Sequence, residues 1–127
     1  MVLFIGFCLC FVASGQAVMT GEPHAVPPNR TDVRREALFA LREFNRDNVQ
    51  DEFTYKLLNI TSAKTQVVAG INYILDVQLG RTLCKKSDST VAKRCISQTV
   101  TKKLQCHFVV TEIPWKNATE VTKRKCG

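Results

Sequence analysis

One segment of the chain carries apolar residues at the 3.6-residue spacing of an amphipathic helix. Asp32, a residue type that caps helices, stands just before this segment, and the pattern ends near Asn48. Basic and acidic side chains fall on or near the opposite face. We therefore expect one helix of about four turns from Val33 to Asn48. Its buried stripe would consist of Val33, Ala37, Leu38, Ala40, Leu41 and Phe44.

The residues after this helix have the pattern of antiparallel strands. Residues 53–61 are rich in aromatic and β-branched side chains, and residues 67–79 and 104–113 alternate apolar with polar positions. Gly80 is expected to end the second run, and the polar residues 81–101 to form a long loop. Pro114-Trp115 interrupts the third run, and residues 119–126 predict a last short strand.

This order of elements indicates the α+β class. A helix comes first, an antiparallel meander follows, and the single helix is the only element available to cover the apolar face of the sheet. Between residues 20 and 31, Pro23, Pro27 and Pro28 exclude a regular helix, so this stretch is expected to be an extended arm.

The first 17 residues are almost wholly apolar and carry no charged side chain. The stretch is short for a membrane span and ends in small residues that suit signal-peptide cleavage after Gly15 or Ala17. We interpret residues 1–17 as a secretory signal, with an uncleaved anchor as the alternative. Residues 18–127 are then expected to form a single domain with an N-terminal arm at 18–31. No other segment is apolar enough to predict a membrane span.

Removal of the signal leaves four of the six cysteines. Four cysteines in a short secreted chain indicate two disulfides, which can be connected in three ways. Local pairing is the simplest geometry, because Cys106 and Cys126 would stand on neighbouring strands, while Cys84 and Cys95 would close a short loop. A cysteine nucleophile is then not expected.

The net charge of +7 is concentrated in the second part of the chain, because residues 1–80 sum to −1 and residues 81–127 to +8. This asymmetry predicts a basic face, which could attract a polyanion such as a glycosaminoglycan or an acidic protein surface. A solvated surface that keeps the protein soluble explains the same pattern and is the simpler interpretation.

Catalytic chemistry has little support in this sequence. Of the two histidines, His24 lies in the arm, and His107 is expected to be a surface residue of a strand rather than a base. The sequence contains no nucleophile elbow, glycine-rich phosphate loop or His/Cys set with metal-ligand spacing. We expect no enzyme activity, cofactor or metal, and no nucleic-acid or membrane partner.

Three short segments place unusual residues outside the predicted core. The segment at 66–70 lies where two strands must turn back, and a turn tip that exposes Val67 and Val68 suggests a contact surface. Pro114-Trp115 places the only tryptophan of the chain between two strands, and tryptophan is enriched in binding interfaces. Gly21 follows Val18-Met19-Thr20 in an otherwise polar arm.

Together these motifs resemble the type 2, or secreted, cystatins, which inhibit papain-like cysteine proteases. The resemblance runs from about residue 21 to residue 126, and the helix segment from Val33 to Asn45 is similar as well. It rests on the family's Gln-x-Val-x-Gly loop, here Gln66-Val67-Val68-Ala69-Gly70, followed by Ile71-Asn72-Tyr73, on Leu79-Gly80-Arg81-Thr82-x-Cys84, on Pro114-Trp115 and on four cysteines in the family's order.

The resemblance implies a long helix held by a curved antiparallel sheet of five strands. It also implies a wedge that fills the cleft of a cathepsin-type protease and inhibits it reversibly and tightly, without a cofactor. The protease-binding residues would be Gly21 in the arm, Gln66, Val67, Val68, Ala69 and Gly70 in the first loop, and Pro114 and Trp115 in the second.

The sequence departs from the family pattern in two places. The residue before the arm glycine is usually apolar, whereas here it is Thr20. Some secreted cystatins also inhibit legumain through an exposed asparagine followed by a small or acidic residue. The nearest candidate here, Asn48-Val49, does not have that form, so no legumain inhibition is expected.

Further expectations concern glycans and oligomeric state. Asn29, Asn59 and Asn117 each begin an acceptor sequon for N-glycosylation, and a glycan on Asn117 would stand close to Trp115. The protein is expected to be a monomer. A dimer could form by exchange of the helix and first strand about a hinge at 67–70.

Two other classes of function fit the size and charge of the chain but not its motifs. A cystatin-fold protein that does not inhibit could bind polyanions or act in defence through its basic second half, but this chain keeps both the Gln-x-Val-x-Gly loop and Pro114-Trp115. A chemokine would need closely spaced cysteines near the mature N-terminus, and the first cysteine after the signal is Cys84.

Overall fold

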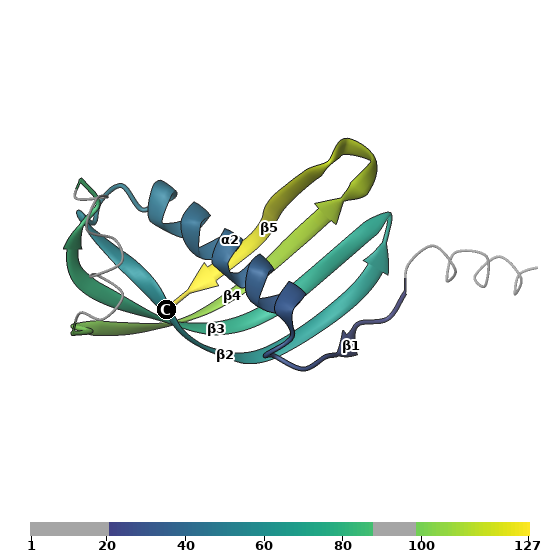
Figure 1. The fold of residues 1–127 in the computed structure, drawn as a ribbon, viewed down its shortest axis with the longest axis horizontal. Helices are drawn as coiled ribbons and strands as arrows, with labels where there is room; N and C mark the ends of the chain where they lie inside the picture. The colour runs from purple at the N-terminus through teal and green to yellow at the C-terminus, as the bar shows by residue number, and fades with distance from the viewer. Residues whose placement is uncertain (1–20, 88–98) are drawn as a thin grey trace, which may run out of the picture.

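The computed structural model describes residues 21–87 and 99–127, in which one α-helix lies against an antiparallel sheet of five strands (Figure 1). The strands are ordered in space as they are in sequence. The α+β class and the five-stranded sheet are therefore confirmed. The elements are β1 (His24–Ala25), α2 (Thr31–Asp47), β2 (Phe53–Val68), β3 (Gly70–Lys85), β4 (Lys102–Ile113), the 3-10 helix η3 (Pro114–Lys116) and β5 (Ala118–Cys126). The expected signal segment lies outside the described residues.

The core forms between α2 and the sheet face that it crosses (Figure 1). The alternation predicted from the sequence is confirmed from Tyr73 to Leu79 on β3 and from Cys106 to Val110 on β4, where every second side chain is buried. Phe44 of α2 contacts the rings of Tyr55 and Phe108 edge-on, at centroid distances of 5.2 and 6.4 Å. The buried apolar set is Val33, Ala37, Ala40, Phe44, Tyr55, Ala63, Tyr73, Leu75, Val77, Leu79, Cys106, Phe108 and Val110.

The helix begins two residues earlier than predicted, and Asp32 is not its cap. A turn in which Arg30 N–H donates to the Pro27 carbonyl leads into the first residue, Thr31. Asp32 lies in the first turn, where its carboxylate accepts two bonds of 2.7 Å from the Arg30 guanidinium and one of 2.9 Å from the Tyr73 hydroxyl. These partners, the guanidinium above all, hold the pKa of Asp32 well below its ordinary value.

Strand β3 does not end at Gly80, so the prediction of a loop from residue 81 is wrong for residues 81–85. The buried Thr82 hydroxyl donates to the Thr54 carbonyl at 2.9 Å, which continues the pairing with β2. Gly80 is needed for packing, because a Cβ there would come within 2.9 Å of the Val100 side chain. The start of β3 also differs from the prediction, since Val67 and Val68 belong to the preceding strand β2.

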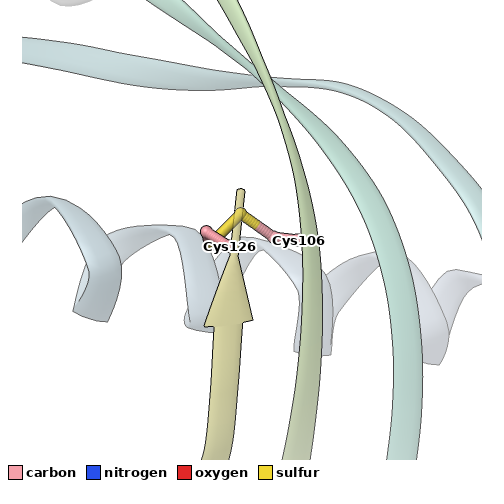
Figure 2. The surroundings of a disulfide bond; sticks show 2 residues. All are labelled: Cys106 and Cys126. Carbon is pink, nitrogen blue, oxygen red and sulfur yellow. A yellow bond between two sulfur atoms is a disulfide. The ribbon is translucent and has the colours of Figure 1, made fainter.

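One disulfide joins the last two strands. Figure 2 shows the bond between Cys106 on β4 and Cys126 at the end of β5. The two Cα atoms are 4.1 Å apart. Local pairing is therefore confirmed for these two cysteines. Cys84 is also disulfide-bonded, and its expected partner, Cys95, lies outside the described residues.

Candidate functional site

The three segments singled out in the sequence lie at one end of the molecule. The arm around Gly21, the β2–β3 hairpin and the β4–β5 hairpin all reach this end, whereas the α2–β2 connection lies at the opposite end (Figure 1). We call the set of Gly21, residues 66–70 and residues 114–117 the hairpin edge. The fold thus brings together segments that are nearly a hundred residues apart in the chain.

The arm is fixed to the first hairpin by hydrogen bonds. Gly21 N–H donates to the Val67 carbonyl at 2.8 Å, and the Gln66 side-chain amide donates to the Gly21 carbonyl at 3.1 Å. Further along, β1 pairs with β2, and Val26 N–H donates to the Ala63 carbonyl at 3.0 Å. The arm therefore runs beside β2 from residue 21 to residue 26.

A polar relay continues from this contact across the sheet. The Asn72 side-chain amide donates to Gln66 Oε1 at 3.2 Å, and the Thr111 hydroxyl donates to Asn72 Oδ1 at 2.6 Å. The Thr122 hydroxyl lies 3.0 Å from the hydroxyl of Thr111. Gln66 is thus the residue of the Gln-x-Val-x-Gly loop that connects the arm to β3, β4 and β5. Sequence analysis missed Asn72, Thr111 and Thr122 as positioning residues, because their proximity depends on strand register.

The tip of the first hairpin requires glycine at position 70. Val68 pairs with Gly70 across Ala69, so the turn lies within the predicted segment 66–70. Gly70 has φ +131°, which side-chain-bearing residues rarely adopt. An added Cβ would also lie 2.4 Å from the Glu112 carbonyl oxygen of β4. The glycine therefore lets the first hairpin pack directly against the strand that leads to the second.

The second hairpin has a short helical tip. Pro114 opens η3, and Asn117 closes it in the left-handed conformation with φ 49°, donating its N–H to the Pro114 carbonyl at 3.0 Å. Ile113 then pairs with Ala118 at the start of β5. This geometry leaves the Trp115 side chain in solvent rather than in the core.

Large apolar side chains are exposed on the hairpin edge. Val67 is 66% exposed and Trp115 64% exposed, whereas Val68, which was expected to be as open as Val67, is partly buried. Exposed tryptophan and valine at loop tips have no role in the fold's own core, and such surface is typical of contact sites.

A carboxyl pair, of which only the helix member is buried, lies next to the second hairpin. Glu36 of α2 is 1% exposed and interacts with Glu112 of β4, one residue before Ile113. Glu36 Oε1 has no hydrogen-bond donor, Oε2 accepts from Arg35 at 3.3 Å, and Glu112 accepts from the Thr119 hydroxyl at 3.0 Å. Burial, and then the neighbouring carboxylate, raise the pKa of Glu36 to about 7.

A single proton on the pair would remove the repulsion between the two carboxylates and supply the missing donor. A protonated Glu36 would be able to donate to Glu112, and the interaction with Glu36 lowers the pKa of Glu112. Sequence analysis missed Glu36, although its position three residues after Val33 and four before Ala40 places it on the buried stripe of the helix.

The other candidate residues lie away from the hairpin edge, except for Asn117. Asn29, Asn59 and Asn117 are all exposed, including Asn59 on β2. His107 is a partly exposed residue of β4, as expected, and its Nδ1 lies 2.7 Å from Asp76 Oδ1.

The described ranges, 21–87 and 99–127, contain neither a metal-binding cluster nor a membrane-spanning helix. No group of three or more His, Cys, Asp and Glu side chains there could hold a metal ion. Within the same ranges, no helix has the length and apolar character needed to cross a membrane.

Comparisons with known proteins agree with the motifs. Residues 21–115 match the family model of the cystatin domain. Over 117 residues, the chain is 34% identical to a cystatin of Coturnix japonica, covering 90% of this chain and 99% of that protein. It is 34% identical to cystatin-C of Mus musculus over 110 residues, which cover 85% and 78% of the two chains. The crystal structure of dimeric human cystatin F is similar with a TM-score of 0.73 and 31% identity, covering 84% of this chain and 86% of that one.

Proposed function

The chain belongs to the type 2 cystatin family of cysteine protease inhibitors, which are not enzymes, and from this premise we propose that it is a secreted, reversible, tight-binding inhibitor of papain-like proteases of the cathepsin type. The proposal rests above all on the hairpin edge, where three segments meet and exposed Val67 and Trp115 stand at loop tips.

The hairpin edge inhibits by occupying the protease cleft. It carries no nucleophile and no reactive group, so its contribution is shape, backbone polarity and apolar surface. The arm at Gly21 follows one side of the cleft, the tip at 68–70 presents small groups to the catalytic cysteine, and Pro114-Trp115 covers the other side. Because the arm and the first tip are already hydrogen-bonded or packed in the free protein, little conformational entropy is lost on binding.

Truncation of Trp115 should weaken protease inhibition more than truncation of any other residue of the hairpin edge. A buried aromatic anchor of an interface typically contributes 2 kcal/mol or more on truncation. We expect Trp115→Ala to weaken inhibition about thirtyfold. Leu83→Ala is the matched control, because Leu83 is a large apolar residue that is 53% exposed on β3 outside the hairpin edge.

The test is a titration of papain with the disulfide-bonded chain from Val18 onward, followed with a fluorogenic peptide. A linear loss of activity to a one-to-one end point, weakened by Trp115→Ala and not by Leu83→Ala, supports the proposal. Absence of inhibition by monomeric, correctly bridged protein contradicts it and leaves the non-inhibitory alternative.

Secretion and processing complete the proposal. Cleavage after Gly15 or Ala17 would release a single domain with its arm, and Cys84 would pair with Cys95. N-terminal sequencing and disulfide mapping of protein secreted by cultured cells test both points. Glycans on Asn29, Asn59 and Asn117 would shift the mass on glycosidase treatment, and one on Asn117 would stand two residues from Trp115 and reduce papain inhibition.

A further inference from the structure

The sheet face turned away from α2, which we call the outer face, carries a group of exposed lysines. On β3 the buried side chains face the helix, so the alternate positions, such as Ile74 and Gly80, belong to the outer face. Residues directly opposite one another across strands share a face. The strand register therefore places Lys64 opposite Ile74, Lys103 opposite Gly80, Lys123 opposite Val109 and Lys125 opposite His107, all on the outer face.

The carboxylates of the protein do not neutralise these lysines. Arginine side chains pair with four of the carboxylates elsewhere in the protein, as Arg30–Asp32, Arg46–Glu43, Arg81–Asp51 and Arg124–Asp47. Among the described residues, none of the four outer-face lysines lies within ion-pair distance of a carboxylate. The acidic residues of the outer face include Glu120 and Asp76, which already pairs with His107.

Protection of the sheet edge does not explain all of this charge. Lysines on an edge strand prevent pairing with other chains, and this applies to Lys123 and Lys125 on the edge strand β5. Pairing of β4 with β5 begins only at Cys106, so Lys103 also lies at an edge of the sheet. Lys64 does not, because it pairs with Ala25 of β1 and with Ile74 of β3, yet it adds to the same charge. Exposed Gln105 lies between Lys103 and His107 on this face and offers an amide donor to an anion.

We propose that the outer face, centred on Lys103, Lys123 and Lys125, binds a sulfated polysaccharide. Lys123 and Lys125 stand about 7 Å apart on one strand, and their ammonium groups suit a flexible, linear polyanion that needs no enclosed pocket. The outer face lies beside the hairpin edge rather than on it. The proposal is therefore independent of the inhibitory function, and the inhibitor bound to an extracellular polysaccharide keeps the hairpin edge open.

Heparin is the probe for this surface. The affinity for heparin is measured near 150 mM NaCl for the disulfide-bonded mature chain and, under the same conditions, for the double variant Lys123→Gln/Lys125→Gln. The control is Arg34→Gln/Arg42→Gln, which removes the same two charges from exposed positions of α2, the element that covers the inner face of the sheet. We expect the lysine variant to bind about tenfold more weakly and the arginine variant to bind within twofold of the wild type.

Papain titration and urea unfolding of the same proteins show whether each variant remains folded and active. Equal loss of heparin affinity in both double variants would overturn the proposal, because net charge alone would then determine binding. Absence of heparin binding by folded wild-type protein would also overturn it. Binding to anionic lipid vesicles as tight as binding to heparin would assign the face to membranes instead.

Discussion

Replacing Glu36 with glutamine changes the carboxyl pair that joins α2 to β4 while keeping its shape. In the wild type the folded protein binds a proton on this pair, because the pKa of Glu36 rises from 4.5 to about 7. The unfolded chain releases that proton near its ordinary pKa. Between these two values the folded state therefore holds more protons, and the stability of the protein must fall as the pH rises.

The magnitude follows from the size of the shift. Each pKa unit corresponds to 1.36 kcal/mol, so the pair alone lowers the unfolding free energy by on the order of 3 kcal/mol between pH 4.5 and pH 7. Glu36 is almost fully enclosed, whereas Glu112 is partly exposed, so solvent screening lowers this figure. Glutamine at position 36 donates an amide hydrogen to Glu112 at every pH, and its contribution does not titrate.

Urea unfolding at pH 5, 6, 7 and 8 measures the effect. The wild type should lose stability over this range more steeply than Glu36→Gln, and the variant should be the more stable protein at pH 8. The difference between the two isolates the pair from all other titrating groups. Glu120→Gln, which removes a carboxylate from an exposed position of β5, should retain the wild-type slope. Parallel curves for wild type and Glu36→Gln would refute the shared proton.

Three further predictions test the site and the fold. Gly70→Ala forces a positive φ and a clash with the Glu112 carbonyl, so we expect a loss of about 2 kcal/mol or more in urea unfolding and a tenfold weaker papain inhibition; unchanged inhibition would contradict the packing argument. Asp32→Asn removes a pairing with Arg30 that stabilises above the ordinary pKa of aspartate and is lost as the pH falls. The variant should therefore be less stable than the wild type at pH 7, and the gap should be clearly narrower at pH 2, as measured by circular dichroism; a gap that keeps its full size at pH 2 would exclude the ion pair as its cause. Copies that exchange α2 and β2 must open the turn at Ala69, so a dimer isolated by gel filtration should not inhibit papain, and an inhibitory dimer would exclude this exchange.

Patterns that depend on neighbouring residues were predicted well from the sequence. The helical stripe and the alternation on β3 and β4 follow from burial of one face. The stripe is confirmed for Val33, Ala37, Ala40 and Phe44, whereas Leu38 and Leu41 are only partly buried, and the alternation is confirmed on both strands. The predicted end of β3 was wrong because Gly80 was interpreted as a turn residue, whereas it makes room for Val100. Asp32 was assigned to the cap because its partner Tyr73 is 41 residues away and leaves no local signal.

At the hairpin edge, too, the residue types were predicted from the sequence and the contacts between them were not. Motifs identified Gly21, residues 66–70 and Trp115 through their residue types, but the contacts that position them depend on register. Gln66 meets Asn72 only because Ala69 forms the turn, and Asn72 meets Thr111 only because β3 and β4 pair in one register. Glu36 was missed because a helical pattern marks a position as buried without showing which residue of the sheet it faces.

An inhibitor without a reactive group must hold its contact surface in place before binding, because energy used to order loops is lost from affinity. In this protein that order comes from contacts within the inhibitor, at the hairpin tips and behind them. Asn72 links the first hairpin to Thr111, Gly70 rests on the Glu112 carbonyl, and Asn117 closes the second tip in a left-handed turn. Glu112 contributes twice, because its carbonyl oxygen meets the first hairpin at Gly70 while its carboxylate interacts with Glu36 of α2. The helix therefore does more than cover the sheet: through Glu36 it reaches the strand on which both hairpins depend.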